Sequence, residues 1–281
     1  MASDLTGGNP PFPTSPGTVR QDAPGAALGP ATTHSPRAPG NRLRFGIAYL
    51  ALAVLLGGAI GLFVVFVGAT HHHQIWSTWK PTQQGVQGRA EIARHVSKEY
   101  ALVGGSQLVS VLSGPPEVQQ TPVRAIIART GLAGETFSDL QIYDASKSWT
   151  YILCGDGANC SIPQGKPSTA RGRLLSREAL ELALYTFKYS HGVDSVVVFM
   201  PPPPGQQAKT SLFFRKKELS DPLKHPLGTT LEQRPERLVV GGLSGADLEA
   251  LRKFVDPRIY NYEFQQAPDG SALMVLSPVT T

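Results

Sequence analysis

The sequence predicts an α+β fold: a mixed-sheet domain with two or three helices, preceded by one transmembrane helix and a disordered tail. Three observations predict it. An apolar run of 23 residues, at positions 45–67, contains neither a charge nor a proline. Only the residues after this run combine short β-branched segments with segments of helical period. The residues before it, 1–41, hold eight prolines and six glycines.

Residues 1–41 show no periodic apolar pattern, so they cannot bury enough apolar surface to offset the entropy of the chain. We therefore predict a disordered tail. Its proline-rich stretches suit docking onto a partner in the polyproline II conformation. A solvated tail without a specific ligand is the simpler interpretation.

Residues 42–68 are predicted to form a membrane anchor helix. At about 1.5 Å per residue, the apolar run spans roughly 34 Å, enough to cross a hydrocarbon core of about 30 Å. Arg37, Arg42 and Arg44 precede the run closely, whereas positions 68–87 carry only Lys80. The positive-inside rule then places the tail in the cytoplasm and everything after about residue 68 outside, in a single-pass cell-membrane protein.

A cleaved signal peptide, cut after Ala69, is the alternative to an anchor, but some forty polar residues precede this run, which a signal peptide does not have. Gly57 and Gly61 form a GxxxG pair that would allow two anchors to dimerise, although glycine is common in spanning helices anyway. Trp76 and Trp79 are expected in the aromatic belt at the outer membrane surface.

Residues 69–82 are predicted to be a juxtamembrane linker. It includes residues 71–73, three adjacent histidines that could bind a transition metal or sense acid. Consecutive residues point in different directions, so a solvated linker is the simpler interpretation, and we predict neither a metal site nor a cofactor.

Cys154 and Cys160 are the only two cysteines in the chain. In an oxidising compartment they are expected to form a disulfide. A thioredoxin-like redox motif has two residues between its cysteines, and a zinc site requires further ligands at a set spacing. Between these cysteines lie five residues, and Gly155, Gly157 and Asn159 among them tolerate positive φ. The pair is therefore interpreted as a local staple.

Residues 83–281 are predicted to be the extracytoplasmic domain, with 22 basic and 19 acidic residues after position 67. Such a mild excess disfavours a dedicated nucleic-acid binder. Helices are expected at 83–102, at 177–190 after a Ser176 cap, and after a Ser244 cap. Strands are expected at 106–114, 123–129, 140–144, 148–153 and 193–200, with an edge strand at 210–219 and a hairpin of 259–264 with 272–276.

The helix at 177–190 should bury Leu180, Ala183, Leu184 and Phe187, while Glu178 and Glu181 favour its start. Because a strand precedes this helix and another follows it, the three elements suggest one crossover unit in a mixed sheet.

An anion-binding site is the most specific functional hypothesis. The segment 161–175 precedes the helix predicted at 177–190, where free backbone N–H groups and the helix dipole favour an anion. Polar and basic residues gather there: Lys166, Ser168, Thr169, Arg171 and Arg173. A lipid head group, a wall polymer or an acidic protein face would fit. A basic surface loop without a specific ligand is the simpler explanation.

No nucleophile elbow, HExxH motif or Cys–His pattern is present, and His95, His191 and His225 are scattered through the sequence. We therefore expect a membrane-anchored interaction or scaffolding module, with the lipid bilayer and a protein of the cell envelope as partners and nucleic acid excluded. The alternative is a tethered envelope hydrolase whose catalytic residues are assembled only by the fold.

Overall fold

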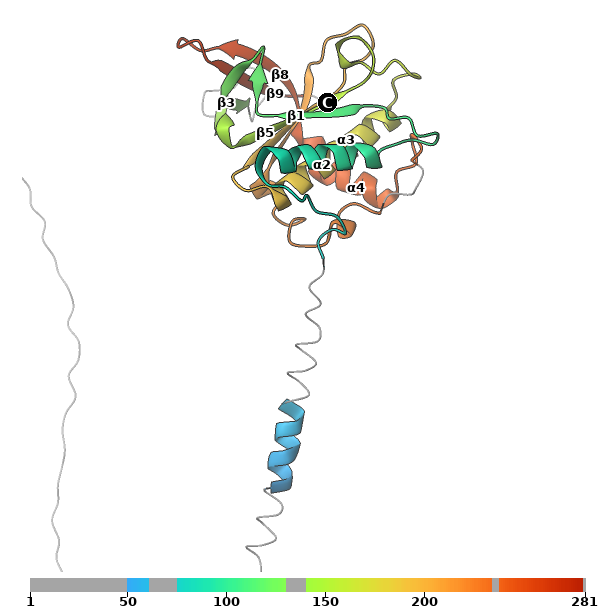
Figure 1. Ribbon diagram of the computed structural model, residues 1–281, viewed down its shortest axis with the longest axis vertical. Helices are drawn as coiled ribbons and strands as arrows, with labels where there is room; N and C mark the ends of the chain where they lie inside the picture. Colours follow the sequence, from blue (N-terminus) through green and yellow to red (C-terminus); the bar gives the residue numbers. More distant parts are fainter. Residues whose placement is uncertain (1–49, 61–74, 130–139, 234–237, 280–281) are drawn as a thin grey trace, which may run out of the picture. The chain divides into compact units, whose positions relative to one another are not determined.

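The computed structural model describes residues 50–60, 75–129, 140–233 and 238–279 (Figure 1). The chain divides into two compact units, Met1–Thr70 and His71–Thr281. In the first unit, residues 50–60 form a helix with exposed side chains, inside the predicted span. The predicted tail, residues 71–73 and Gly61 lie outside the described residues. Within the described ranges, no helix is long and apolar enough to cross a membrane.

In the second unit, the described residues form a mixed sheet of nine strands that is nearly closed. The order is β1-β5-β6-β7-β8-β9-β3-β2, and β4 pairs with β3. The strands are β1 Ser110–Gly114, β2 Glu117–Val118, β3 Thr121–Arg129, β4 Leu140–Asp144, β5 Ser148–Cys154, β6 Ser195–Phe199, β7 Thr210–Arg215, β8 Ile259–Gln266 and β9 Ala272–Pro278. Arg215 of β7 donates to Gln141 and Tyr143 of β4 at 2.9 and 2.6 Å, so the sheet curls until these two strands meet.

Helices α2 Gly85–Glu99, α3 Thr169–Tyr189 and α4 Gly245–Phe254 gather on one side of this sheet (Figure 1). Their apolar side chains and one face of the central strands form the larger core, which includes Ile92, Tyr151, Val198 and Phe214. The described part of this unit also has five short 3-10 helices: η2 Ala145–Lys147, η3 Ala158–Cys160, η4 Lys216–Leu219, η5 Leu227–Thr229 and η6 Asp256–Arg258. The predicted α+β domain is therefore confirmed.

The opposite face of the sheet holds a second, smaller core. Phe213 and Met274 are buried there, and Tyr260, Tyr262 and Phe264 of β8 pack against it. Asn261 and Glu263, which alternate with these aromatic residues along β8, are exposed. Because the sheet curls, these rings bury one another without a covering helix.

The predicted crossover unit is also present, since β5 and β6 pair in parallel and α3 connects them. Leu180, Ala183, Leu184 and Phe187 are all buried, as expected. Its predicted start is wrong, however. Helix α3 begins at Thr169, eight residues before the expected first residue, because the Ser168 side chain accepts a hydrogen bond from the Arg171 N–H.

Helix α2 follows its predicted segment. Ile92, Ala93 and Val96 are buried on its inner face, as is Tyr100 just after the helix, whereas Val86 is exposed. The sequence predicted an edge strand at 210–219, and this prediction is wrong. Strand β7 lies between β6 and β8 with four consecutive buried residues, and the two lysines follow it in η4.

The C-terminal elements agree with the sequence. The Ser244 side chain caps α4 by accepting from the Asp247 N–H at 3.0 Å, and β8 and β9 form the expected antiparallel hairpin.

The expected place of Trp76 in an aromatic belt is wrong. Its ring is 7% exposed, packs against Tyr185 and Tyr189, and donates to the Pro222 carbonyl at 3.3 Å. A ring buried in the domain core cannot lie at a lipid surface.

Candidate functional site

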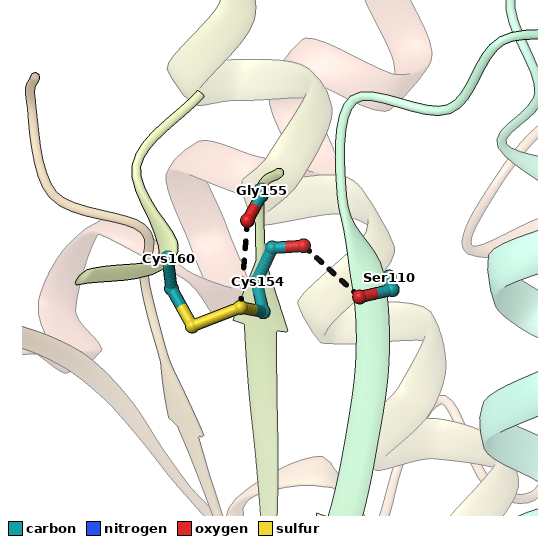
Figure 2. Close-up of a disulfide and its surroundings, with 4 residues drawn as sticks. All are labelled: Ser110, Cys154, Gly155 and Cys160. Carbon is teal, nitrogen blue, oxygen red and sulfur yellow. Dashed lines mark hydrogen bonds between the residues drawn. A yellow bond between two sulfur atoms is a disulfide. The ribbon is translucent and has the colours of Figure 1, made fainter. Parts of the chain in front are cut away.

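Cys154 and Cys160 form the expected disulfide, with 4.3 Å between their Cα atoms (Figure 2). Cys154 ends β5, and Ser110 of β1 donates to its carbonyl at 3.1 Å. Because a disulfide sulfur carries no hydrogen, the 3.5 Å approach of the Cys154 Sγ to the Gly155 carbonyl is a contact and not a hydrogen bond.

The two glycines of this loop serve a different purpose from the one expected. Asn159 has a φ of 55°, but neither Gly155 nor Gly157 has a positive φ. Instead the loop passes close to them: an added Cβ would lie 2.3 Å from the Ser161 carbonyl oxygen at Gly155, and 2.5 Å from the Ser161 Oγ at Gly157. Their N–H groups bond to the Cys160 and Ser161 carbonyls at 2.9 Å each. They permit close packing, not a left-handed turn.

The early start of α3 changes the setting of the predicted anion site. Thr169, Arg171 and Arg173 belong to the first turns of the helix, and Lys166 and Ser168 are exposed just before it. Ser168 is occupied as the helix cap. Arg171 turns back and donates to the Gln164 carbonyl at 2.5 Å, so it holds the loop in place. Arg173 pairs with Asp256.

A pocket of about 570 Å³ lies where α3 and α4 begin. Thr169 and Gly245, the first residues of the two helices, both line it. Arg173 and Arg252 also line it, together with Glu249. The first N–H groups of a helix have no partner within the helix and its start carries a partial positive charge. Ser168 and Ser244 accept from one N–H group each, of Arg171 and Asp247, and the pocket lies beside both helix starts. The pocket thus joins two of the predicted residues, Thr169 and Arg173, with a second helix start and a second arginine that the sequence did not indicate.

The ion pairs at this pocket are exposed. Arg252 pairs with Glu249, and their side chains are 71% and 60% exposed. The Arg173–Asp256 pair is about one-third exposed. Exposed pairs of this kind contribute about 0–1 kcal/mol, so either arginine can exchange its carboxylate for an incoming anion at small cost.

A buried ionic network lies further along α3, and sequence reasoning missed it. Arg177 is 1% exposed and lies 3.2 Å from the Glu181 carboxylate and 2.9 Å from the Asp247 carboxylate. It also donates to the Tyr100 hydroxyl at 2.7 Å and to the Glu232 carbonyl at 2.5 Å. Burial alone would lower the pKa of Arg177, whereas the Tyr100 oxygen and the two carboxylates raise it above its ordinary value. One guanidinium therefore connects α2, α3, α4 and the segment after η5.

This network borders a second pocket, of about 350 Å³. Ser77, His95, Glu181 and Tyr185 line it. The Ser77 and Tyr185 hydroxyls are 2.6 Å apart, and the His95 ring stacks on Trp79 at 3.9 Å between centroids. Ser77, His95 and the Glu181 carboxylate, which are far apart in the sequence, thus line the same pocket. No periodic pattern could have indicated this, because Ser77 lies in the segment before α2.

Two other histidines in the described part of the chain, His191 and His225, lie outside both pockets. His225 lies 3.8 Å from Asp221 on the surface. Among the residues that the structure describes, no three His, Cys, Asp or Glu side chains gather as metal ligands.

No protein-family model, curated protein or solved structure matches this chain, so its function has to be argued from the chemistry of these residues.

Proposed function

We propose that the protein is a single-pass membrane-anchored interaction module whose folded domain lies outside the cytoplasm and contacts anionic envelope material. The apolar run at 45–67 and the arginines before it support the anchor and its direction. The Cys154–Cys160 disulfide suits an oxidising compartment. A protein partner in the envelope, and an anchor dimer through Gly57 and Gly61, belong to the same proposal.

The observation that supports an anionic ligand is the pocket beside the first turns of α3 and α4. A phosphate or carboxylate placed there would lie beside the starts of both helices and within a lining that includes Arg173 and Arg252. An arginine supplies planar, bidentate donors, which suit the oxygens of these groups. A cation in the same place would face two helix starts and two guanidinium groups, and the Glu249 carboxylate beside them is already paired with Arg252.

The test is binding of the full-length protein, in detergent, to vesicles of phosphatidylglycerol, with phosphatidylcholine vesicles as the neutral reference. The charge-removing variant is Arg173→Gln with Arg252→Gln. The matched control is Arg124→Gln, whose partner Asp269 is equally on the surface but belongs to the β8–β9 turn. A hydrogen bond to a charged group contributes about 1.5 kcal/mol or more, so each arginine is expected to change the affinity by about tenfold.

Added inorganic phosphate distinguishes the two sources of the same chemistry. If the ligand is a free phosphate, phosphate competes for the pocket at low concentration. If it is a lipid head group, binding weakens only as ionic strength rises. Equal vesicle binding by the double variant and by the Arg124→Gln control would overturn the anionic ligand.

A hydrolase is the second candidate, and the pocket that holds Ser77 and His95 favours it. Its chemistry would require the Ser77 hydroxyl as nucleophile and His95 as the base. A fluorophosphonate probe should then label the wild-type protein and not Ser77→Ala. The interaction module predicts that the probe labels neither protein.

A further inference from the structure

The pocket beside the first turns of α3 and α4 has an apolar wall as well as its two arginines. Ala170, Leu243 and Leu248 line it together with Arg173 and Arg252. The three apolar side chains come from three segments: the first turn of α3, the turn before α4, and α4 itself. A single exposed apolar residue is common on a protein surface and needs no explanation. Here three of them converge on one pocket, next to two guanidinium groups.

Helix α4 has one side in the core and another side at the pocket. The side in the core consists of Asp247, Ala250 and Leu251. The side that lines the pocket consists of Gly245, Leu248, Glu249 and Arg252. Positions three and four apart share one side of a helix, so this second side is continuous. Leu248 is 45% exposed there, and packing within the domain therefore does not account for a leucine at this position.

The turn before α4 fixes the part of the wall that Leu243 provides. The Gly242 N–H donates to the Val239 carbonyl at 2.9 Å and closes the turn. Gly241 has a φ of 93°, in the left-handed region that favours glycine. A Cβ added there would lie 3.7 Å from the Ala170 Cβ, so the turn lies against the start of α3. Leu243 then packs against the larger core, which leaves the wall preformed.

We infer that this pocket binds an amphiphilic phosphate, with the anionic head at Arg173 and Arg252 and the alkyl part against Leu243 and Leu248. The inference names the ligand class of the proposed anionic site and rests on that proposed function. The volume of about 570 Å³ lies within the range of roughly 300–1,000 Å³ that is usual for small-molecule sites. The head group takes the place of the Glu249 carboxylate at Arg252, which costs little because that pair is exposed.

The other occupants of such a pocket use only half of its lining. Inorganic phosphate would meet the arginines but would leave the apolar wall in water, where its burial stabilises nothing. An uncharged alkyl ligand would cover Leu243 and Leu248 but would gain nothing from the guanidinium groups. Only a ligand that joins both chemistries uses the whole lining.

The test is calorimetric binding of methyl, butyl and hexyl phosphate to the full-length protein in phosphatidylcholine nanodiscs. Empty nanodiscs of the same lipid correct for partitioning into the bilayer. The charge of the head group is the same throughout the series, so only the apolar part changes. Each methylene that the pocket buries should tighten binding by up to about fourfold. Hexyl phosphate should therefore bind about tenfold or more tightly than methyl phosphate.

Two variants separate the apolar wall from the arginines. Leu248→Gln should reduce the advantage of hexyl phosphate several-fold and leave the affinity for methyl phosphate unchanged, since glutamine is a good helix former and the buried side of α4 is intact. Arg173→Gln with Arg252→Gln should weaken all three phosphates by a similar factor. The matched control is Ile142→Gln, which changes an exposed apolar residue of β4 outside the pocket and should bind the whole series as the wild type does.

The outcomes distinguish this inference from the anionic site on which it rests. Equal affinities for methyl and hexyl phosphate, both weakened in the arginine double variant, would overturn the apolar part and leave the anionic site standing. Hexyl phosphate binding that the arginine double variant does not weaken would overturn the anionic site itself. A chain-length effect that Leu248→Gln leaves unchanged would place the alkyl part elsewhere and overturn the inference, and absence of binding by the whole series would overturn both.

Discussion

Replacing Arg177 by methionine is expected to destabilise the domain more than any other single loss of a charge. The side chain keeps its approximate length, but Glu181 and Asp247 remain buried, with side chains 3% and 7% exposed, without the guanidinium between them. Removing one partner of a buried ion pair costs about 3–5 kcal/mol, because the remaining charge is left without compensation. For a domain of this size, that lowers Tm by about 6–20 °C.

The assay is thermal unfolding of the full-length protein, followed by near-UV circular dichroism. Arg252→Met is the matched control, since this arginine also pairs with a carboxylate on a helix but lies on the surface. It should change stability by no more than about 1 kcal/mol. Adding Asp247→Asn to Arg177→Met should recover part of the loss, because one buried charge then disappears.

The result that would refute this reasoning is a Tm for Arg177→Met within a degree or two of that of Arg252→Met. The network would then not hold the three helices together. A loss in Arg177→Met that Asp247→Asn makes worse would show that the missing packing, and not the buried charge, is the cause.

Two further predictions concern the disulfide and the acid sensitivity of the sheet. Changing Cys154 and Cys160 to serine removes the cross-link that closes a loop of about seven residues, and it should lower the unfolding free energy by about 2.4 kcal/mol. A reductant should lower the Tm of the wild type but not that of this variant. A wild-type Tm that does not change with reductant would contradict a stabilising disulfide. Although burial acts to raise it, Arg215 and Arg258 hold the pKa of Glu218 below its usual value. That stabilisation is present above the unfolded pKa of about 4.3 and is lost as pH falls through the lower folded pKa. Glu218→Gln should therefore weaken the protein in denaturant unfolding at pH 7 and differ little at about pH 3; an equal loss at both values would contradict it.

Long segments with a clear period could be predicted from the sequence, because burial on one face imposes the period directly. This is why the predicted buried face of α3 is correct. The start of α3 could not be predicted in the same way. Its first turn is polar and exposed, so it has no apolar period, and the cap at Ser168 is a local hydrogen bond that Ser176 could equally have made.

The candidate site was predictable only where its residues are neighbours in the sequence. Thr169 and Arg173 were found because they are close together, whereas Arg252 reaches the same pocket from α4. The Arg177–Glu181 spacing was visible on one helix, but its third member, Asp247, comes from another element. Lys216 and Lys217 led to the wrong prediction of an edge strand, because they lie in η4, after the end of β7, and β7 itself lies inside the sheet.

The direction in which the chain crosses the membrane decides the setting of both proposals, and cleavage at the cell surface tests it most directly. The protein would carry one epitope before Met1 and another after Thr281, each joined through a site for a specific protease that is added to intact cells. The positive-inside rule predicts loss of the C-terminal epitope and protection of the N-terminal one. Loss of the N-terminal epitope with the C-terminal one intact would contradict it.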